Sequence, residues 1–402
     1  MKMARLEMIY LAALSMLGFV ATDMYLPAFE RMQDYFGSGA EAVALSLSVF
    51  LAGLALGQLL WGVISDRFGR RNALLLGLGL FVLSSLAVLV VDSIWQLLLL
   101  RALQALGVSA AAVIWQAMVI AEKSEPDAQR LFATIMPLVA LTPALAPQLG
   151  VVLMHGFDWQ AIFVALAVMG ALCFGVTLMR PADRPQPVST GIAADFGLLL
   201  RRPNYLGNVL IYSAGSAAFF AFLTGLPKVM TSLGYGAGDI AGVFIPQTLA
   251  FMAGGYLGKR AVEKCGDAWV LKQLLLVFAL ASLILLVVSQ LSIPVIWPLI
   301  APFCLLAAAN GALYPIVVNR ALRCAKECPA TAAGLQNSIQ ISISFAASAA
   351  VALFASRALE AVGIAIGLSC IGVMLGYVIS EPGQRRQWVA PDPARVAVDE
   401  RE

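Results

Sequence analysis

The sequence contains twelve apolar runs, each long enough to cross a lipid bilayer as a helix. A hydrocarbon core about 30 Å thick requires about 20 helical residues, because the rise is about 1.5 Å per residue. Of the 402 residues, 61% are hydrophobic and only 12% are charged, and the mean hydropathy is +0.87. These values exclude an ordinary soluble domain and predict an all-α integral membrane protein. The expected spans are 6–29, 41–64, 72–91, 95–121, 130–154, 159–179, 207–230, 238–258, 268–290, 293–319, 330–355 and 358–380.

The distribution of positive charge predicts how these spans are oriented. Lys and Arg residues are retained in cytoplasmic loops during membrane insertion. With both termini inside, Arg31, Lys228 and Arg357 are the outer exceptions among the 26 Lys and Arg residues, and Arg101 lies within a span. We therefore expect a multi-pass protein whose N and C termini are cytoplasmic.

A hydrophilic stretch divides the twelve spans into six and six. It runs from Arg180 to Tyr205 and contains four prolines, at positions 181, 185, 187 and 203, which are typical of a linker. We expect an N-terminal six-helix bundle at 1–185, a cytoplasmic linker at 186–206, a C-terminal six-helix bundle at 207–380 and a cytoplasmic tail at 381–402.

The loop after the second span combines glycine with charge. Positions 62–71 read G-x-x-x-D-R-x-G-R-R, and a related pattern follows the eighth span at 258–266. Gly62 permits close helix approach, and Asp66 can face a neighbouring helix N-terminus, where a negative charge is worth ~0.3–1 kcal/mol. The loop resembles a motif of the major facilitator superfamily, which implies a twelve-helix fold of two six-helix bundles. The resemblance gives a conformational role to Gly62, Asp66, Arg67, Gly69 and Arg70; the alternative is that the arginines only set the membrane topology.

Further stretches resemble the Bcr/CflA branch of the drug:proton antiporters within that superfamily. These are 21–28, 101–107 and 159–163, while 111–117, 207–212, 309–318 and 335–337 resemble purine nucleoside transporters of the same branch. The resemblance implies a monomeric, proton-coupled secondary transporter of the bacterial inner membrane. Such a protein exports or exchanges small organic solutes, either drugs or purine nucleosides, by alternating access. It uses the proton gradient, needs no cofactor and has no nucleic-acid partner.

Asp23 is the one acidic residue in the interior of an apolar run. A carboxylate within a bilayer costs about 3 kcal/mol on insertion scales, so it indicates a function and a partner. Counting the helical rise from the outer ends of the first and fourth spans places Asp23 and Arg101 at a common depth, roughly 10 Å below the outer surface. We hypothesise that Asp23 accepts the transported proton and that Arg101, in contact directly or through water, favours its charged form, with Gln104 and Tyr25 nearby. The alternative is a static ion pair that joins the two spans.

Polar and aromatic side chains within the spans recur at helical spacing. Asn208 and Tyr212 share one face of the seventh span, and Asn310 and Tyr314 share one face of the tenth. Rings stack on planar solutes, and amides recognise donors and acceptors on a heterocycle. The expected substrate-binding residues are Tyr25, Trp115, Gln116, Asn208, Tyr212, Phe219, Gln247, Asn310, Tyr314, Gln336, Asn337 and Gln340. The alternative is that the amides join helices and the rings pack in the core.

Other classes of function fit the sequence less well. An intramembrane enzyme needs a base, a second carboxylate or metal ligands at membrane depth, and the spans supply one acid and no histidine. Cys324 and Cys328, with a single histidine in the chain, are too few for a zinc site, so we expect no metal. A purine nucleoside uptake carrier without drug efflux, and a sensor that keeps the fold but transports nothing, stay open as alternatives.

Overall fold

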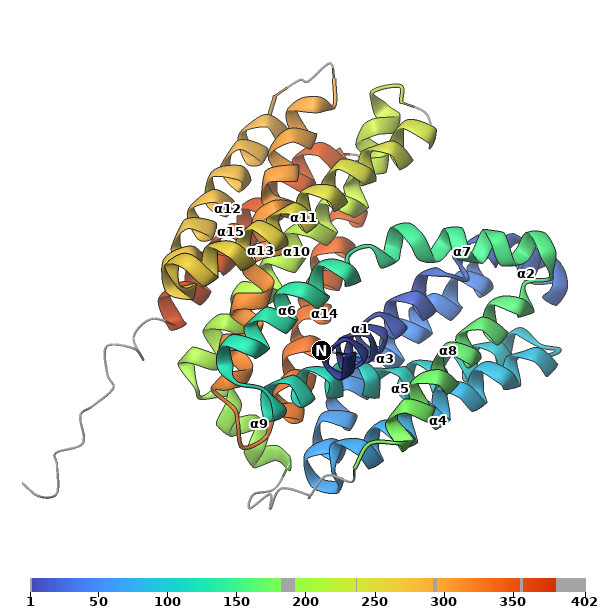
Figure 1. Ribbon diagram of the computed structural model, residues 1–402. Coiled ribbons are helices and arrows are strands. Elements are labelled where there is room, and N and C mark those ends of the chain that lie inside the picture. Colours follow the sequence, from blue (N-terminus) through green and yellow to red (C-terminus); the bar gives the residue numbers. More distant parts are fainter. Residues whose placement is uncertain (1, 182–191, 236, 292–294, 355–356, 381–402) are drawn as a thin grey trace, which may run out of the picture.

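The computed structural model describes residues 2–181, 192–235, 237–291, 295–354 and 357–380, and nearly all of them are helical (Figure 1). The first half contains α1 (Lys2–Asp23), the 3-10 turn η1 (Leu26–Ala28), α2 (Phe29–Phe36), α3 (Ala40–Phe68), α4 (Arg70–Ala87), the 3-10 turn η2 (Val88–Val90), α5 (Ile94–Glu122), α6 (Glu125–Val139), α7 (Thr142–Gly156) and α8 (Gln160–Leu178). The second half contains α9 (Ile192–Leu200), α10 (Pro203–Ser232), α11 (Ala237–Cys265), α12 (Asp267–Ser289), α13 (Trp297–Arg323), α14 (Pro329–Leu353) and α15 (Ala358–Ser380). The predicted tail and part of the predicted linker lie outside the described residues, so the domain boundaries stay predictions.

The predicted spans correspond to single long helices, except for the first and the fifth. The fifth span consists of two 15-residue helices, α6 and α7, which are separated at Ala140 and Leu141. Pro143 lies at the start of α7, and a proline both removes an N–H donor and clashes with the preceding turn. Within the described residues, nine helical segments are long and apolar enough to cross a membrane by length and composition. Helices α11 and α14 are 29 and 25 residues long but are interrupted by more polar side chains.

The first span ends earlier than the sequence predicts. Helix α1 stops at Asp23, whereas the expected span continues to residue 29. Pro27 lacks the N–H that would bond to the carbonyl of Asp23 in a continuous helix, so the chain turns there and continues through η1 and α2. Asp23 therefore lies at a helix end and not in a helix interior.

The helices form two bundles, one from each half of the chain. In the N-terminal bundle α5 packs against α1, α3 and α4, and in the C-terminal bundle α10 packs against α13, α14 and α15. One cluster of buried apolar side chains lies within the C-terminal bundle, and the other fills the N-terminal bundle and continues into α10, α13 and α14. Packed apolar side chains are thus shared between the bundles where they meet.

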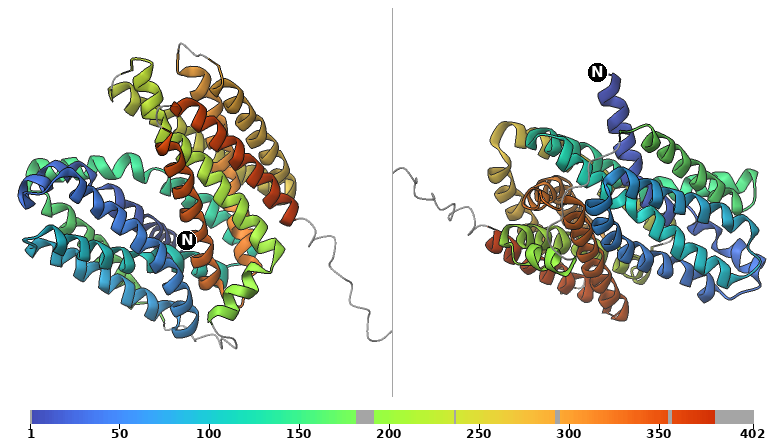
Figure 2. Two further views of the ribbon diagram at one scale, coloured as in Figure 1. Left: turned by 180° about the vertical axis from the view of Figure 1, so that it is seen from behind. Right: turned by 90° about the horizontal axis from the view of Figure 1, so that it is seen from below.

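The two bundles meet at one end of the molecule, which we call the linker end. It holds the α3–α4 junction (66–70) and the α13–α14 turn (324–331). Helix α3 packs against α14 there, and α6 packs against α11 and α13. Figures 1 and 2 show the bundles converging at this end and spreading apart toward the opposite end, where α2 lies. The structure is therefore a conformation closed at the linker end.

Candidate functional site

Arg101, in the first half of α5, is fully buried between aromatic rings. Its guanidinium carbon lies 4.0 Å from the ring centroid of Tyr25 and 4.0 Å from that of Phe50. Its Nη1 also donates a hydrogen bond to Oε1 of Gln104 at 2.5 Å. A cation over a desolvated ring gains about 2 kcal/mol, so the two rings offset part of the cost of burying this charge. Gln104 and Tyr25 are the neighbours that the sequence predicts.

The same guanidinium group holds the end of α1. Nη1 and Nη2 of Arg101 donate to the carbonyl oxygen of Ala21 at 3.2 and 3.3 Å. The last carbonyls of a helix lack partners within the helix, and a basic group there is stabilising by about 0.3–2 kcal/mol. Gln104 extends the network by donating from Nε2 to Ser85 Oγ at 2.7 Å, which connects α5 to α4. Arg101 thus fixes the helix end that carries Asp23.

Asp23 itself is half-buried at this helix end. In the part of the chain that the structure describes, its carboxylate forms neither a hydrogen bond nor an ion pair. The predicted contact with Arg101 is not a direct one in this conformation, because the guanidinium group binds the Ala21 carbonyl two residues earlier. Arg101 nevertheless reaches α1 close to Asp23, as the common depth predicts. Asp23 retains accessible surface.

Asp66 joins the two bundles at the linker end. Its Oδ1 and Oδ2 accept hydrogen bonds from the backbone N–H groups of Ala330 and Thr331, at 3.1 and 2.7 Å. These are the second and third residues of α14, whose own N-cap residue, Cys328, makes no side-chain capping bond. Asp66 therefore supplies from α3 the cap that α14 lacks. Asp66 is 7% exposed, so water screens this contact only weakly.

Close backbone packing surrounds this cap. A Cβ atom on Gly62 would lie 2.7 Å from the carbonyl oxygen of Ala330, and one on Gly334 would lie 2.2 Å from that of Gln58. Only glycine permits such an approach of α3 to α14. Gly69 connects α3 to α4 with a positive φ of 90°, a backbone conformation that side chains disfavour. The structure thus explains the residue type at three of the five predicted motif positions, Gly62, Asp66 and Gly69. Arg67 and Arg70 lie on either side of Gly69.

A second contact between the bundles lies between α6 and α11. Nε of Arg130 lies 3.1 Å from Oε1 of Glu263, and Nζ of Lys259 donates to Oγ1 of Thr134 at 2.9 Å. Lys259 and Glu263 belong to the 258–266 repeat of the loop motif. The two related sequence patterns therefore both contribute contacts between the bundles.

The C-terminal bundle presents a polar seam along α10, α13 and α14. Nε2 of Gln340 donates to Oγ of Ser216 at 2.6 Å, and Oγ of Ser344 lies 3.0 Å from the same oxygen. The rings of Tyr212 and Tyr314 meet edge to face at 4.9 Å. Gln340 and both tyrosines are half-buried and keep accessible surface.

Several other predicted substrate residues are buried. Asn310 donates from Nδ2 to the carbonyl of Gly215 at 3.1 Å, and its Oδ1 has no partner among the described residues. Gln116 and Asn337 face each other across the bundles, with Nε2 and Oδ1 3.5 Å apart. The amide of Gln336 is fully buried with neither atom hydrogen-bonded in the described chain.

Three of the remaining predicted residues are buried within their own bundles: Asn208 donates from Nδ2 to the carbonyl of Asn204 in the same helix, Gln247 is buried, and Trp115 packs on Phe132. Phe219 is half-buried and stacks on Phe303. Tyr25 is fully buried beneath Arg101. In this conformation Tyr25 acts on Arg101 through its ring, and its hydroxyl lies 3.2 Å from Ser46 Oγ. The structure therefore separates the predicted set into an accessible group and a buried group.

Two contributors were missed at the level of sequence. Phe50 forms the second ring on Arg101, and no local pattern distinguishes it from other apolar residues of its span. Ser344 follows Gln340 by one helical turn, so the same spacing that selected Gln336 and Gln340 would have included it.

The matching family model identifies the architecture. It is described as the Major Facilitator Superfamily and matches residues 11–349. The chain belongs to this superfamily. It is 29% identical over 348 residues to a bicyclomycin resistance protein homolog of Haemophilus influenzae, covering 84% of this chain and 86% of the relative. It is also 29% identical over 328 residues to a chloramphenicol resistance protein of Pseudomonas aeruginosa, covering 78% and 75%. The predicted resemblance to the Bcr/CflA-type drug:proton antiporters is confirmed by these relatives.

A solved structure of the superfamily has the same fold. The transporter FucP in its outward conformation superimposes with a TM-score of 0.72 at 13% identity, covering 93% of this chain and 98% of FucP. Together the family and the fold indicate that this superfamily member is a transporter and not an enzyme. Among the described residues, no group of three or more His, Cys, Asp or Glu side chains could hold a metal ion.

Proposed function

We propose that this superfamily member is a proton-coupled drug exporter of the bacterial inner membrane. The linker end faces the cytoplasm, the two halves at 1–185 and 207–380 rock about the linker at 186–206, and a monomer suffices. The relatives named for bicyclomycin and chloramphenicol resistance support small organic solutes as cargo. With the linker end closed, the conformation described above is the one that opens outward.

One observation supports the coupling role. Asp23 is half-buried, has no partner among the described residues, and lies near an arginine that is fully buried. An unpaired carboxylate near low-dielectric surroundings changes its proton occupancy readily, because burial and nearby charge act in opposite directions. Arg101 holds the end of α1 in place and adds a positive charge close to this carboxylate. Entry of a proton or of a cationic solute at Asp23 would alter this balance, so proton and cargo compete.

The accessible group on the C-terminal bundle is the proposed cargo surface. Tyr212, Tyr314 and Phe219 offer ring faces and edges, and Gln340 offers an amide. Such surfaces accept flat, partly polar molecules without demanding one shape. The buried amides Asn310 and Gln336 have unpaired atoms that a heterocycle could satisfy, and this favours purine nucleosides as a second candidate cargo.

Transport by purified protein in proteoliposomes tests the coupling. We expect that Asp23→Asn abolishes uphill drug transport driven by an imposed pH gradient, while downhill exchange of drug persists. Glu30→Gln, an exposed acid seven residues later, is the matched control and should leave both intact. Wild-type gradient dependence in Asp23→Asn would overturn the coupling role.

Competition separates the two cargo classes and the sensor alternative. Labelled adenosine, inosine and guanosine are compared with chloramphenicol and a panel of cationic drugs in the same vesicles. Competition by drugs supports the exporter, and competition by nucleosides alone supports the purine carrier. No counterflow of any solute would support the sensor.

A further inference from the structure

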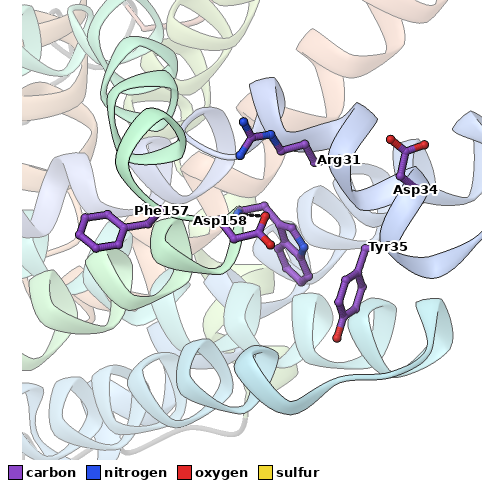
Figure 3. Close-up of a pocket in the computed structure, with 6 residues that line it drawn as sticks. Arg31, Asp34, Tyr35, Phe157 and Asp158 are labelled. Atoms are coloured by element: carbon purple, nitrogen blue, oxygen red, sulfur yellow. Dashed lines mark hydrogen bonds between the residues drawn. The ribbon is translucent and has the colours of Figure 1, made fainter.

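An open surface pocket of about 530 Å³ lies at the end of the N-terminal bundle opposite the linker end. It is lined by Arg31, Asp34 and Tyr35 of α2 and by 157–159, the turn between α7 and α8. Figure 3 shows the labelled side chains arranged around this space, with Phe157 on one flank and Tyr35 on the other. None of its lining residues belongs to the proposed coupling site or to the proposed cargo surface.

The charges of this pocket favour a cation. Asp34 and Asp158 supply two carboxylates against one guanidinium group. Arg31 is partly engaged elsewhere, because its Nη1 donates to the carbonyl of Met154 at 3.1 Å. Asp158 uses Oδ1 to accept the backbone N–H of Trp159 at 2.7 Å, which leaves its second oxygen available. The lining therefore carries a net negative charge beside free carboxylate oxygens.

Aromatic rings form the rest of the wall. Trp159 is 1% exposed and is held by edge contacts with Tyr35 and Phe163, at 5.3 and 5.9 Å between centroids. Phe157 is 71% exposed, so its ring is open to an approaching ligand. Ring faces attract cations, and the ring contacts of Tyr35 and Trp159 reduce the freedom that these two side chains lose when a ligand binds.

The indole N–H group of Trp159 lacks a hydrogen-bond acceptor among the described residues. This Nε1–H group is buried. Buried donors are paired in most proteins, and an unpaired one costs about 1–3 kcal/mol. A ligand oxygen or an ordered water would satisfy this group.

We propose that this pocket is a second small-molecule site, separate from Asp23, which binds a ring-bearing organic cation that carries a hydrogen-bond acceptor. The carboxylates of Asp34 and Asp158 bind the positive charge, Tyr35 and Phe157 cover the ring, and the indole N–H of Trp159 meets the acceptor. The site lies at the opposite end of the molecule from the linker end. A ligand can therefore occupy it without any step of the transport cycle.

Calorimetric titration of the full chain in nanodiscs with berberine, an aromatic cation with ether oxygens, tests the proposal. Empty nanodiscs provide the background. The titration is made in the Asp23→Asn background, so that the coupling carboxylate cannot account for binding. We expect saturable binding that weakens about fivefold in Asp34→Asn and in Asp158→Asn, the upper end for an exposed charge. Asp158→Asn keeps an oxygen that accepts the Trp159 backbone N–H, so the turn should stay intact.

Two comparisons sharpen the result. Glu360→Gln removes an exposed carboxylate from the other bundle and should leave affinity unchanged. Trp159→Phe should weaken berberine more than tetraphenylphosphonium, a cation without an acceptor. Loss of all saturable binding in Asp23→Asn, or unchanged affinity in both pocket-acid variants, would overturn the proposal.

Discussion

The cap that Asp66 provides to α14 predicts how strongly one side chain controls the conformation. In Asp66→Ala the N–H groups of Ala330 and Thr331 lose their charged acceptor, and the carboxylate that attracts the positive end of α14 is lost. We expect the linker end to open more often, because these bonds exist only while α3 and α14 are in contact. Proton binding at Asp23 is not directly altered.

The expected magnitude follows from the two contacts. A hydrogen bond to a charged group contributes about 1.5–3 kcal/mol, and a charge at a helix N-terminus adds about 0.3–1 kcal/mol. Hydration of the freed N–H groups in the open state recovers part of this energy. Loss of about 3 kcal/mol would change the ratio of closed to open molecules by roughly 100-fold, since about 1.4 kcal/mol corresponds to a factor of ten.

Distance measurements between spin labels at Asn72 and Lys326, both exposed at the linker end, report the shift. The labels are attached in a background without the six native cysteines. Asp66→Ala should add a population with longer distances than the wild type. Glu122→Ala is the matched control, because Glu122 is also an acid at this end but pairs at 2.8 Å with Arg180 of its own bundle.

Two results would refute this reasoning. One is a distance distribution in Asp66→Ala that matches the wild type, which would mean that close packing of α3 on α14 suffices for closure. The other is an equal shift in Glu122→Ala, which would mean that any lost acid at this end has the same effect.

Three further predictions concern other contacts. Arg130→Glu and Glu263→Arg should each lower the ratio of closed to open molecules up to about fivefold, measured with the same labels, since an exposed pair is worth at most about 1 kcal/mol. The double swap should restore the ratio. Failure of the swap to restore it would assign the effect to other neighbours. Gly334→Ala should abolish drug transport at normal expression, because its Cβ would collide with a carbonyl, whereas Gly175→Ala, with nothing within 4 Å, should transport normally. Arg101→Lys should lower the thermal unfolding temperature, measured by intrinsic fluorescence, by several degrees. An ammonium group cannot bind one carbonyl through two nitrogens while lying between two rings. An unchanged temperature would contradict the stabilising role of the stacked guanidinium.

The fold was predictable because each membrane helix can be recognised from its own stretch of sequence. Each span must satisfy its backbone hydrogen bonds internally, so length and apolar composition predict it without reference to the rest of the chain. The errors fall at prolines. Pro27 ends α1 at Asp23, and the interruption before Pro143 divides the fifth span, although a proline in a membrane helix can equally produce only a bend.

The candidate site was predictable in part. Helical rise alone brought Arg101 to the level of Asp23, and the glycine and acid of the 62–71 loop suggested a helix terminus as the partner of Asp66. The identity of that terminus, on α14 about 260 residues away, depends on how the two bundles dock. Tyr25 looked like a substrate contact by residue type, but its ring is covered by the guanidinium group of Arg101.

The sequence by itself determined the membrane class, the six-plus-six organisation and the isolated charge in the first span. These depend on composition and on periodicity along one helix. The tertiary structure decided which groups meet. Arg101 binds the carbonyl of Ala21 and not the carboxylate of Asp23, Asp66 accepts from the backbone of α14, and Arg130 pairs with Glu263. Such contacts are set by side-chain rotamers and by the packing of helices distant in sequence, and no local pattern encodes either.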